Sequence, residues 1–472
     1  MSMSPAAILA RYRAARERRR PWDCVWQECY DHVLPRTPGL GGPTLYDGTA
    51  ADAAEQLAAS LVAQLTPAWS RWFALAPSRG LAGSAEAAEV APLLEDAAEA
   101  LQAHLDQSNF AVEMHQAFLD LVVAGTAVLA VEEQPPGTDA AFRFAAVPMR
   151  DAVLEQGPSG RLDTVFRAAA LTVAEIRERF PGAALPRAAR EAEETSLPVI
   201  EATWPEHGGH RFAAILAADE DAPALLAQGR FAESPFIAFR WLKAPGETYG
   251  RGPVMKALPD IRTAQKVVEL VLKNASIAVT GIWQADDDGV LNPANVRLVP
   301  GAIIPKAVGS QGLTPLAAPG RFDVSQLVLE DLRRRIRNAL LADRLAPPAD
   351  ARMTATEVLE RSAETARLLG ATYGRLQTEL LTPLVGRCLA ILHRRGEIPG
   401  LILDGSRTAL RYRSPLAQIE ARAAAQPALL WLQAVAALGP EAAALIDAPA
   451  AARYLARTLG APSELLTHIP QE

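Results

Sequence analysis

Apolar residues recur every three or four positions along much of the chain, which is the spacing of one face of an α-helix. Between Asp47 and Leu65, for example, Leu57 and Leu61 keep this repeat among alanines, the residues of highest helix propensity. The pattern predicts a helix over the first thirty residues, with a break at Pro21, because proline favours the first position of a new helix. Further helices are predicted over residues 86–107, 111–119, 171–180, 253–280, 322–345, 354–395 and 417 onward.

Shorter apolar runs bounded by turn residues interrupt these helices and predict β-strands. The runs cover residues 126–132, 143–147, 161–167, 212–216 and 236–241, and a hairpin turn is predicted at residues 157–160. Residues 281–306 also have strand character. The sequence therefore predicts an α+β fold that is predominantly α-helical.

The ends of two helices are marked by local signals. The pattern Thr-x-x-Glu occurs at residues 172–175 and as Thr-Ala-Thr-Glu at residues 354–357, and it predicts a capping box at each helix start. The second box opens the long helix over residues 354–395. We expect Pro383 to kink that helix and Gly396 to end it.

Composition and charge narrow the classes of function. The chain has 472 residues, half of them hydrophobic, and a formal net charge of −7. That charge argues against a protein that grips nucleic acid over its whole surface, but it is compatible with one that lets nucleic acid slide past. Three cysteines are too few for a disulfide framework and indicate a reducing compartment. No apolar run has the roughly 20 residues of a membrane span, and no signal peptide is expected.

One cysteine motif contains potential metal ligands. Cys24, Cys29 and His32 do not have the spacing of a zinc knuckle, and a fourth ligand is missing. We expect the two cysteines to pack with Trp22 and Trp26 instead.

Two further polar motifs have simple interpretations as turns. The run His207-Gly208-Gly209-His210 is expected to be an exposed turn. Asp286, Asp287, Asp288 and Gly289 lack the alternating ligands of a calcium loop and favour a hairpin turn. The sequence therefore predicts neither a metal site nor a cofactor.

Catalytic motifs are also absent from the sequence. No Gly-Lys-Ser/Thr follows a glycine-rich stretch, which excludes a P-loop ATPase, and there is no Gly-x-Ser-x-Gly elbow. We expect no catalytic residues. Trp69, Trp72 and Phe73 form either a recognition patch or part of the core, and their position after an amphipathic helix favours the core.

Five ordered groups of residues nevertheless form a recognisable set. They are Leu45-Tyr46-Asp47-Gly48-Thr49 with Arg71-Trp72-Phe73, Val147-Pro148 with Val165-Phe166-Arg167, Tyr249-Gly250-Arg251-Gly252-Pro253, Met353-Thr354-Ala355-Thr356-Glu357-Val358 with Glu379-Leu380-Leu381 and Pro383, and Ser414-Pro415-Leu416-Ala417. Together the groups resemble the podovirus-type (T7-like) head-to-tail connector, or portal, family of bacteriophages.

This resemblance implies a portal fold with defined parts. The expected parts are an N-terminal α/β wing (1–252), a first stem helix (253–280), a small β-containing clip (281–321), a second stem helix (322–342), a tunnel loop (343–353), a long kinked wing helix with its return (354–416) and a C-terminal helical, crown-like segment (417–472).

The resemblance also implies functional residues. The tunnel loop would constrict the channel with Arg344, Pro347, Pro348 and Arg352, and Asp286–Gly289 would form the clip tip. Basic residues on the stem helices are candidates for contact with DNA phosphates in the channel: Arg262, Lys266, Lys273, Arg333 and Arg337. The alternative is that these cations form salt bridges between subunits with Glu269, Glu330 and Asp331, or remain solvated.

The implied function is that of a ring subunit without enzymatic activity. The ring, expected to be a dodecamer, would sit at the portal vertex of the virion, assemble in the host bacterial cytoplasm, and pass double-stranded DNA during packaging and ejection. The expected partners are the major capsid protein, the scaffolding protein, the terminase large subunit and a tail adaptor, with no membrane. The alternatives are another virion structural protein, such as a core or tail protein, or a phage enzyme with an unrecognised site.

Overall fold

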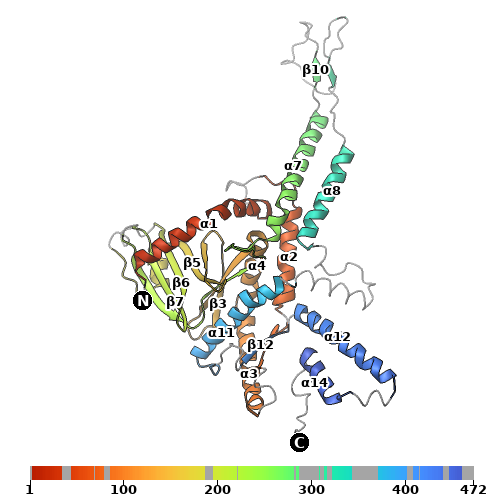
Figure 1. The fold of residues 1–472 in the computed structure, drawn as a ribbon. Coiled ribbons are helices and arrows are strands. Elements are labelled where there is room, and N and C mark those ends of the chain that lie inside the picture. The colour runs from red at the N-terminus through yellow and green to blue at the C-terminus, as the bar shows by residue number, and fades with distance from the viewer. Residues whose placement is uncertain are drawn as a thin grey trace.

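The computed structural model describes most of the chain. The described residues are 3–34, 44–68, 70–78, 85–186, 195–219, 222–280, 283–285, 308, 313–315, 322–342, 370, 372–400, 408–413, 415–439 and 446–459. They form a mixed body of helices and sheets from which one pair of helices projects (Figure 1). More residues lie in helices than in strands, as predicted.

The helix α1 (Pro5–Val33) is continuous, so the predicted break at Pro21 is wrong. An internal proline removes one helical hydrogen bond, and packing on both sides of it compensates here. The guanidinium of Arg19 donates to three main-chain carbonyls around the start of β4 (Ala152–Gln156). On the other side of the proline, Trp22 and Trp26 pack against Tyr249.

The larger sheet has five antiparallel strands in the order β4-β5-β6-β7-β8. After β4 come β5 (Leu162–Leu171), β6 (Leu197–Glu206), β7 (Gly209–Leu216) and β8 (Ala224–Phe231). One side of the sheet packs against the first turns of α1, and the other packs against the short helix α5 (Val173–Arg179). Thr172 and Glu175 form the predicted capping box.

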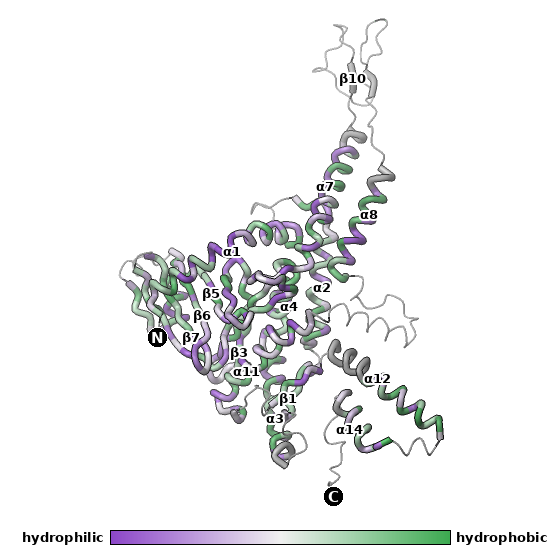
Figure 2. Tube along the Cα trace, in the orientation of Figure 1, coloured by the Kyte–Doolittle hydropathy of each residue, from purple (hydrophilic) through white to green (hydrophobic). Residues whose placement is uncertain are grey.

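A smaller sheet lies at the centre of the body. Its strands are β3 (Phe142–Val147), β2 (Thr126–Glu133) and β9 (Phe236–Arg240), with β2 in the middle. The helices α2 (Thr49–Leu65), α3 (Ala85–Gln107) and α4 (Phe110–Ala124) pack beside this sheet around the main core. Figure 2 shows α4 as a largely hydrophobic helix inside the body, as its burial requires.

Two segments that are far apart in sequence close the core. The strand β1 (Phe73–Pro77) pairs with β12 (Thr408–Tyr412) in an antiparallel ladder. The helix α11 (Thr382–Arg394) lies against β2 and follows the π-helical turn η2 (Gln377–Leu381). The helix ends as predicted at Gly396, which has a left-handed φ of 76°.

The projecting pair consists of α7 (Pro253–Thr280) and α8 (Phe322–Ala339), which we call the helical pair. Beyond it, β10 (Trp283–Ala285) pairs with β11 (Leu313–Pro315). The observed bounds of α7 are those predicted. The helix α8 ends three residues before the predicted end of the second stem helix, at a turn where Leu341 has a φ of 56°.

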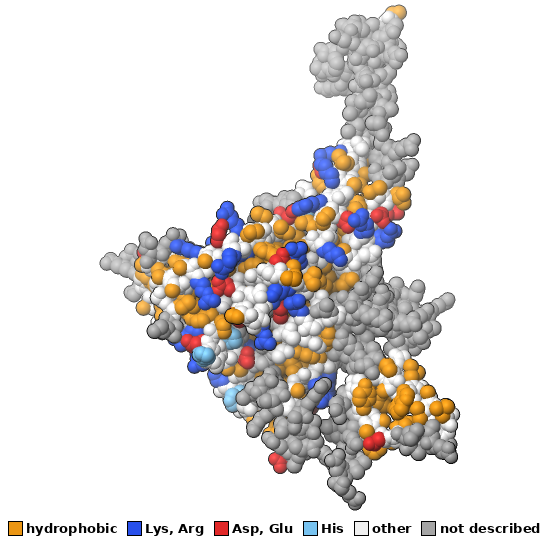
Figure 3. Space-filling model, in the orientation of Figure 1, with side chains coloured by type: hydrophobic (Ala, Val, Ile, Leu, Met, Phe, Trp, Pro, Cys, Tyr) orange, Lys and Arg blue, Asp and Glu red, His pale blue; other side chains and the backbone are white. Residues whose placement is uncertain are grey.

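The C-terminal part of the described chain is helical, as expected. It contains α12 (Pro415–Ala437) and α14 (Ala448–Leu459), which contact each other. The helix α12 leaves several large apolar side chains exposed, including Leu430 and Trp431, and Figure 3 shows hydrophobic atoms gathered on these two helices.

Candidate functional site: the junction between the helical pair and the body

The N-terminal half of α7 is largely buried, and the described residues of its C-terminal half are largely exposed. Val254, Leu258 and Ile261 belong to the main core, whereas Leu270 and Leu272 are 48% and 53% exposed. The other helix of the pair repeats this division. The pair is therefore anchored in the body at one end and presents apolar side chains to solvent at the other.

Three of the cations predicted to contact DNA lie on α7. Arg262 binds both carboxylate oxygens of Glu28 on α1, and these hydrogen bonds lower the pKa of Glu28. Lys266 and Lys273 both contact Glu269 within their own helix, at 2.9 and 2.5 Å. Arg262 thus links the helical pair to the body, and the two lysines share one local carboxylate.

The other two predicted cations lie on α8. Arg333 donates through Nε to the Oδ2 atom of Asp47, at 2.8 Å. Arg337 lies in the last turn of the helix. The neighbouring Arg335 reaches across to Asp260 on α7, at 2.8 Å, so an ion pair also joins the two helices directly.

Asp47 connects both helices of the pair to the start of α2. Its carboxylate accepts from Arg333 on α8 and from the main-chain amide of Thr49, at 3.0 Å. Its main chain is held by the side-chain amide of Gln265 on α7, which donates to the carbonyl of Asp47 and accepts from the amides of Tyr46 and Asp47. We call Asp47, Gln265 and Arg333 the clamp.

The charge state of the clamp follows from these contacts. Burial of Asp47 opposes ionisation, but the hydrogen bonds from Thr49 and Arg333 outweigh burial and lower the pKa of the carboxyl group. Asp47 is therefore ionised at neutral pH, and its charge is matched by that of Arg333.

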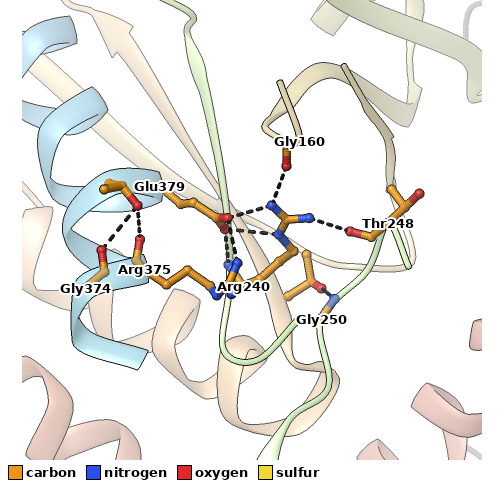
Figure 4. Close-up of polar contacts among 9 residues, drawn as sticks. Gly160, Arg240, Thr248, Gly250, Gly374, Arg375 and Glu379 are labelled. Atoms are coloured by element: carbon orange, nitrogen blue, oxygen red, sulfur yellow. Dashed lines mark hydrogen bonds and ion pairs between the residues drawn. The ribbon is translucent and has the colours of Figure 1, made fainter. Parts of the chain in front are cut away.

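A second polar centre lies beside the loop that leads into α7 (Figure 4). Arg240, at the end of β9, is almost completely buried, and its guanidinium binds both oxygens of Glu379 on η2, at 2.6 and 3.1 Å. The same guanidinium donates to the carbonyls of Gly160 and Thr248. One side chain thus joins the small sheet, the β4–β5 hairpin, the loop before α7 and the π-helical turn.

Glycines allow the loop before α7 to reach this centre. A Cβ atom on Gly250 would lie 2.2 Å from the carbonyl oxygen of Gly125, and one on Gly252 would lie 2.6 Å from the carbonyl oxygen of Val122. Gly125 itself has a φ of 73°. The backbones approach so closely that no side chain fits, which explains two glycines of the Tyr-Gly-Arg-Gly-Pro segment.

The predicted irregularity at Pro383 takes the form of the π-helical turn η2, which immediately precedes α11. Because proline cannot donate and crowds the carbonyl four residues earlier, a continuous α-helix is disfavoured there. The Thr382 hydroxyl and the Tyr412 hydroxyl both contact the carbonyl of Gln377 within the turn. The turn directs Glu379 toward Arg240.

Several predicted residues lie outside the described part of the chain. They are the tunnel-loop residues Arg344, Pro347, Pro348 and Arg352, the clip-tip residues Asp286, Asp287, Asp288 and Gly289, the capping box at residues 354–357, and Trp69.

The remaining predictions fall on described residues. Trp72 and Phe73 are buried in the main core, as expected. Cys29 is buried in the main core and Cys24 is exposed, and the expected packing of the two cysteines with Trp22 and Trp26 stays a prediction. His207 and Gly208 form the exposed turn between β6 and β7, whereas Gly209 and His210, which were also expected in the turn, are partly buried and begin β7. Within the described ranges, no three metal-binding side chains gather, and no helix is long and apolar enough to cross a membrane.

Sequence reasoning did not identify Arg240, Glu379 or Gln265. Arg240 ends a strand that is otherwise apolar, and a charged residue at such a position signals a buried ion pair. Glu379 belongs to one of the segments that carry the family resemblance, as does Asp47, but their partners lie more than one hundred residues away.

Comparisons with known proteins agree with the family resemblance that the five sequence segments indicated. The family model of the bacteriophage head to tail connecting protein matches residues 6–466. The probable portal protein of Bordetella phage BPP-1 is 25% identical over 495 aligned positions, which cover 97% of this chain and 88% of that protein. The portal protein of Salmonella phage epsilon15 is 22% identical and covers 88% of this chain and 79% of its own length.

Among solved structures, a chain from the virion of a native gene transfer agent particle aligns with a TM-score of 0.41 and 13% identity, over 88% of this chain and 90% of that one. The family match extends over nearly the whole sequence and contains every element of the junction. The chain is therefore a member of the family of bacteriophage head-to-tail connecting proteins.

Proposed function

We propose that twelve copies of this chain form a closed ring at one vertex of a phage capsid, and that double-stranded DNA passes through the ring. The ring has a structural role and catalyses no reaction. The observation that carries the proposal is the helical pair, which is anchored at its base and exposes apolar side chains along its outer half. An apolar surface of this kind on a projecting element is typical of an interface with another protein.

The exposed residues suit contact with further copies of the chain. Leu270 and Leu272 lie on α7, and Leu327 and Val328 are 71% and 44% exposed on α8. A closed ring uses heterologous contacts, so each subunit needs two different surfaces. The two helices of the pair supply one apolar surface each.

The parts of the ring are proposed from the family resemblance, and the order of the described elements supports them. In this proposal α7 and α8 are the stem helices, residues 281–321 the clip, residues 343–353 the tunnel loop, and residues 417–472 the crown-like segment. Residues 1–252 and the long helix with its return form the wing. The tunnel loop would narrow the channel, and the clip would face the terminase large subunit during packaging and the tail adaptor afterwards.

The exposed charges of the helical pair agree with a channel through which DNA slides. Glu269 pairs with two lysines, and Asp331 pairs with Arg334 within α8. A surface whose cations are only partly matched by local carboxylates makes few phosphate contacts, and each such contact would add affinity and slow movement. The major capsid and scaffolding proteins are the partners we propose for the wing.

Native mass spectrometry of the purified chain tests the proposal. The expected species has twelve times the chain mass of 50.4 kDa. Rings of thirteen subunits would preserve the conduit and change only the subunit number. A monomer or dimer at every salt concentration and at micromolar protein would contradict the proposal.

A further inference from the structure

The geometry points to a division of labour among the cations of the helical pair: Arg333, held by the clamp with Asp47 and Gln265, positions the pair against the body, whereas Lys266 and Lys273 carry the charge that meets DNA. This inference rests on the proposed function, because it assigns residues to the channel of that ring. It changes the role of Arg333 from a phosphate contact to a positioning residue.

The environment of Asp47 holds Arg333 in place. The carboxylate is almost fully buried, and Arg333 supplies the matching charge at 2.8 Å. A buried carboxylate that loses its cation is left with an uncompensated charge, which is strongly unfavourable. Arg333 therefore cannot turn toward a DNA phosphate without exposing or neutralising Asp47.

One short segment, residues 46 and 47, holds both helices. Gln265 on α7 makes three hydrogen bonds to the main chain of residues 46 and 47, between 2.6 and 3.1 Å. Arg333 on α8 binds the side chain of the second of these residues. The two helices are consequently fixed to the same point at the start of α2, and the direction of the pair depends on that point.

The two lysines lie in a different environment from Arg333. Lys266 and Lys273 each have 63% of the side chain exposed, and they share Glu269 within a single helix. The two lysines and Glu269 together carry a net charge of +1, and no other contact described for these three residues balances it. Hydrogen bonds with Glu269 raise the pKa of Lys273, so the ammonium group remains charged. Helical spacing places these lysines away from the buried face that contains Ile261 and Gln265.

The experiment compares Arg333→Gln, Asp47→Asn, Lys273→Gln and the control Arg334→Gln, which removes only an exposed pair within α8. Hydrogen–deuterium exchange is measured over residues 45–49, 261–268 and 330–340 of the assembled protein. Binding of a short linear DNA duplex is measured as a function of salt concentration.

We expect Arg333→Gln and Asp47→Asn each to accelerate exchange in these three segments by about tenfold or more, because hydrogen bonds to a buried charge hold them closed. The double variant should be no faster than either single variant, because both remove the same interaction. Lys273→Gln should leave exchange unchanged and reduce the slope of log Kobs against log salt by about 0.9 for each phosphate contact that the substituted ring loses. Arg334→Gln should change neither quantity.

Unchanged exchange in Arg333→Gln, or a reduced salt slope in that variant at normal exchange, would overturn the inference. A wild-type protein that forms no ring and binds no duplex would contradict the proposed function. In that case, the exchange comparison would still decide whether the clamp holds the pair.

Discussion

Glu379 accepts hydrogen bonds from both the main-chain amide and the guanidinium of Arg240, so a π-helical turn and the end of a central strand are joined by one buried carboxylate. Arg240 also donates to the carbonyl of Thr248 in the loop before α7. The glycine contacts and the Arg240–Glu379 pair therefore hold the loop that leads into α7, and the clamp holds the helical pair separately at Gln265 and Arg333.

Loss of the carboxylate at position 379 should destabilise the body. Glu379→Ala leaves the guanidinium of Arg240 buried without its counter-charge, and we expect the free energy of unfolding to fall by about 3–5 kcal/mol in urea denaturation. The matched control is Glu247→Ala, which removes the exposed partner of Arg251 and should change stability little. Equal effects of the two substitutions would show that the buried pair has no special role.

A methyl group at position 125 should also be poorly tolerated. In Gly125→Ala the new Cβ would meet the amide nitrogen of Gly252 at 2.2 Å, and the backbone has a left-handed φ. We expect destabilisation by about 1–3 kcal/mol or more, with accelerated hydrogen exchange at the start of α7. Gly182→Ala is the control, because nothing lies within 4 Å of its Cβ position. If Gly125→Ala had the same free energy of unfolding as the wild type, the close approach of Gly125 to Gly252 would be contradicted.

The elements of this fold differ in how far local sequence determines them. The bounds of α7 and the capping box of α5 were predictable, because the signals lie within each helix. The pairing of β1 with β12 was not, because its two strands are separated by most of the chain. The continuity of α1 through Pro21 depends on contacts of Arg19 and the tryptophans with other elements, which no local pattern contains.

In the candidate site, too, some features were predictable from local sequence and others depend on distant contacts. The glycines and Asp47 were visible within the segments that resemble the connector family. Their physical role emerges only when Gln265 and Arg333 are brought beside Asp47. A basic residue on an amphipathic helix has the same sequence signature whether it faces DNA or a buried carboxylate, so Arg333 and Lys273 could not be distinguished from sequence.

The stability of the body should depend on the ionisation of Asp120. Burial raises the pKa of this carboxyl group to about 6, against the effect of the hydrogen bond that it accepts from Tyr30. The folded state therefore binds a proton more tightly than the unfolded state, and stability falls as pH rises from about 4 through 6. Asp120→Asn should abolish this dependence and gain up to about 3 kcal/mol relative to the wild type between pH 4 and pH 7.

Urea denaturation of both proteins at a series of pH values provides the measurement. Asp151→Asn is a suitable control, because Asp151 lies at a more exposed position outside the core. If the free energy of unfolding changed with pH in the same way in the wild type and in Asp120→Asn, the raised pKa of Asp120 would be contradicted.

The exposed apolar side chains of the helical pair should be needed for assembly and not for folding. Leu327→Lys places a charge in the proposed subunit interface, and we expect the ring to dissociate while the thermal unfolding of the subunit is little changed. Val112→Lys, at a residue that is 61% exposed on α4 of the body, is the control and should leave the ring intact. Sedimentation velocity distinguishes these outcomes. Intact rings in Leu327→Lys would remove this surface from the interface.

The central claim is that the chain closes into a ring with a hole wide enough for DNA. Negative-stain electron microscopy of the purified protein, with class averages viewed down the particle axis, tests it most directly. We predict twelvefold averages with an open centre that admits B-form duplex DNA, roughly 20 Å across. Uniform small particles without a central opening, under all salt conditions, would contradict the account.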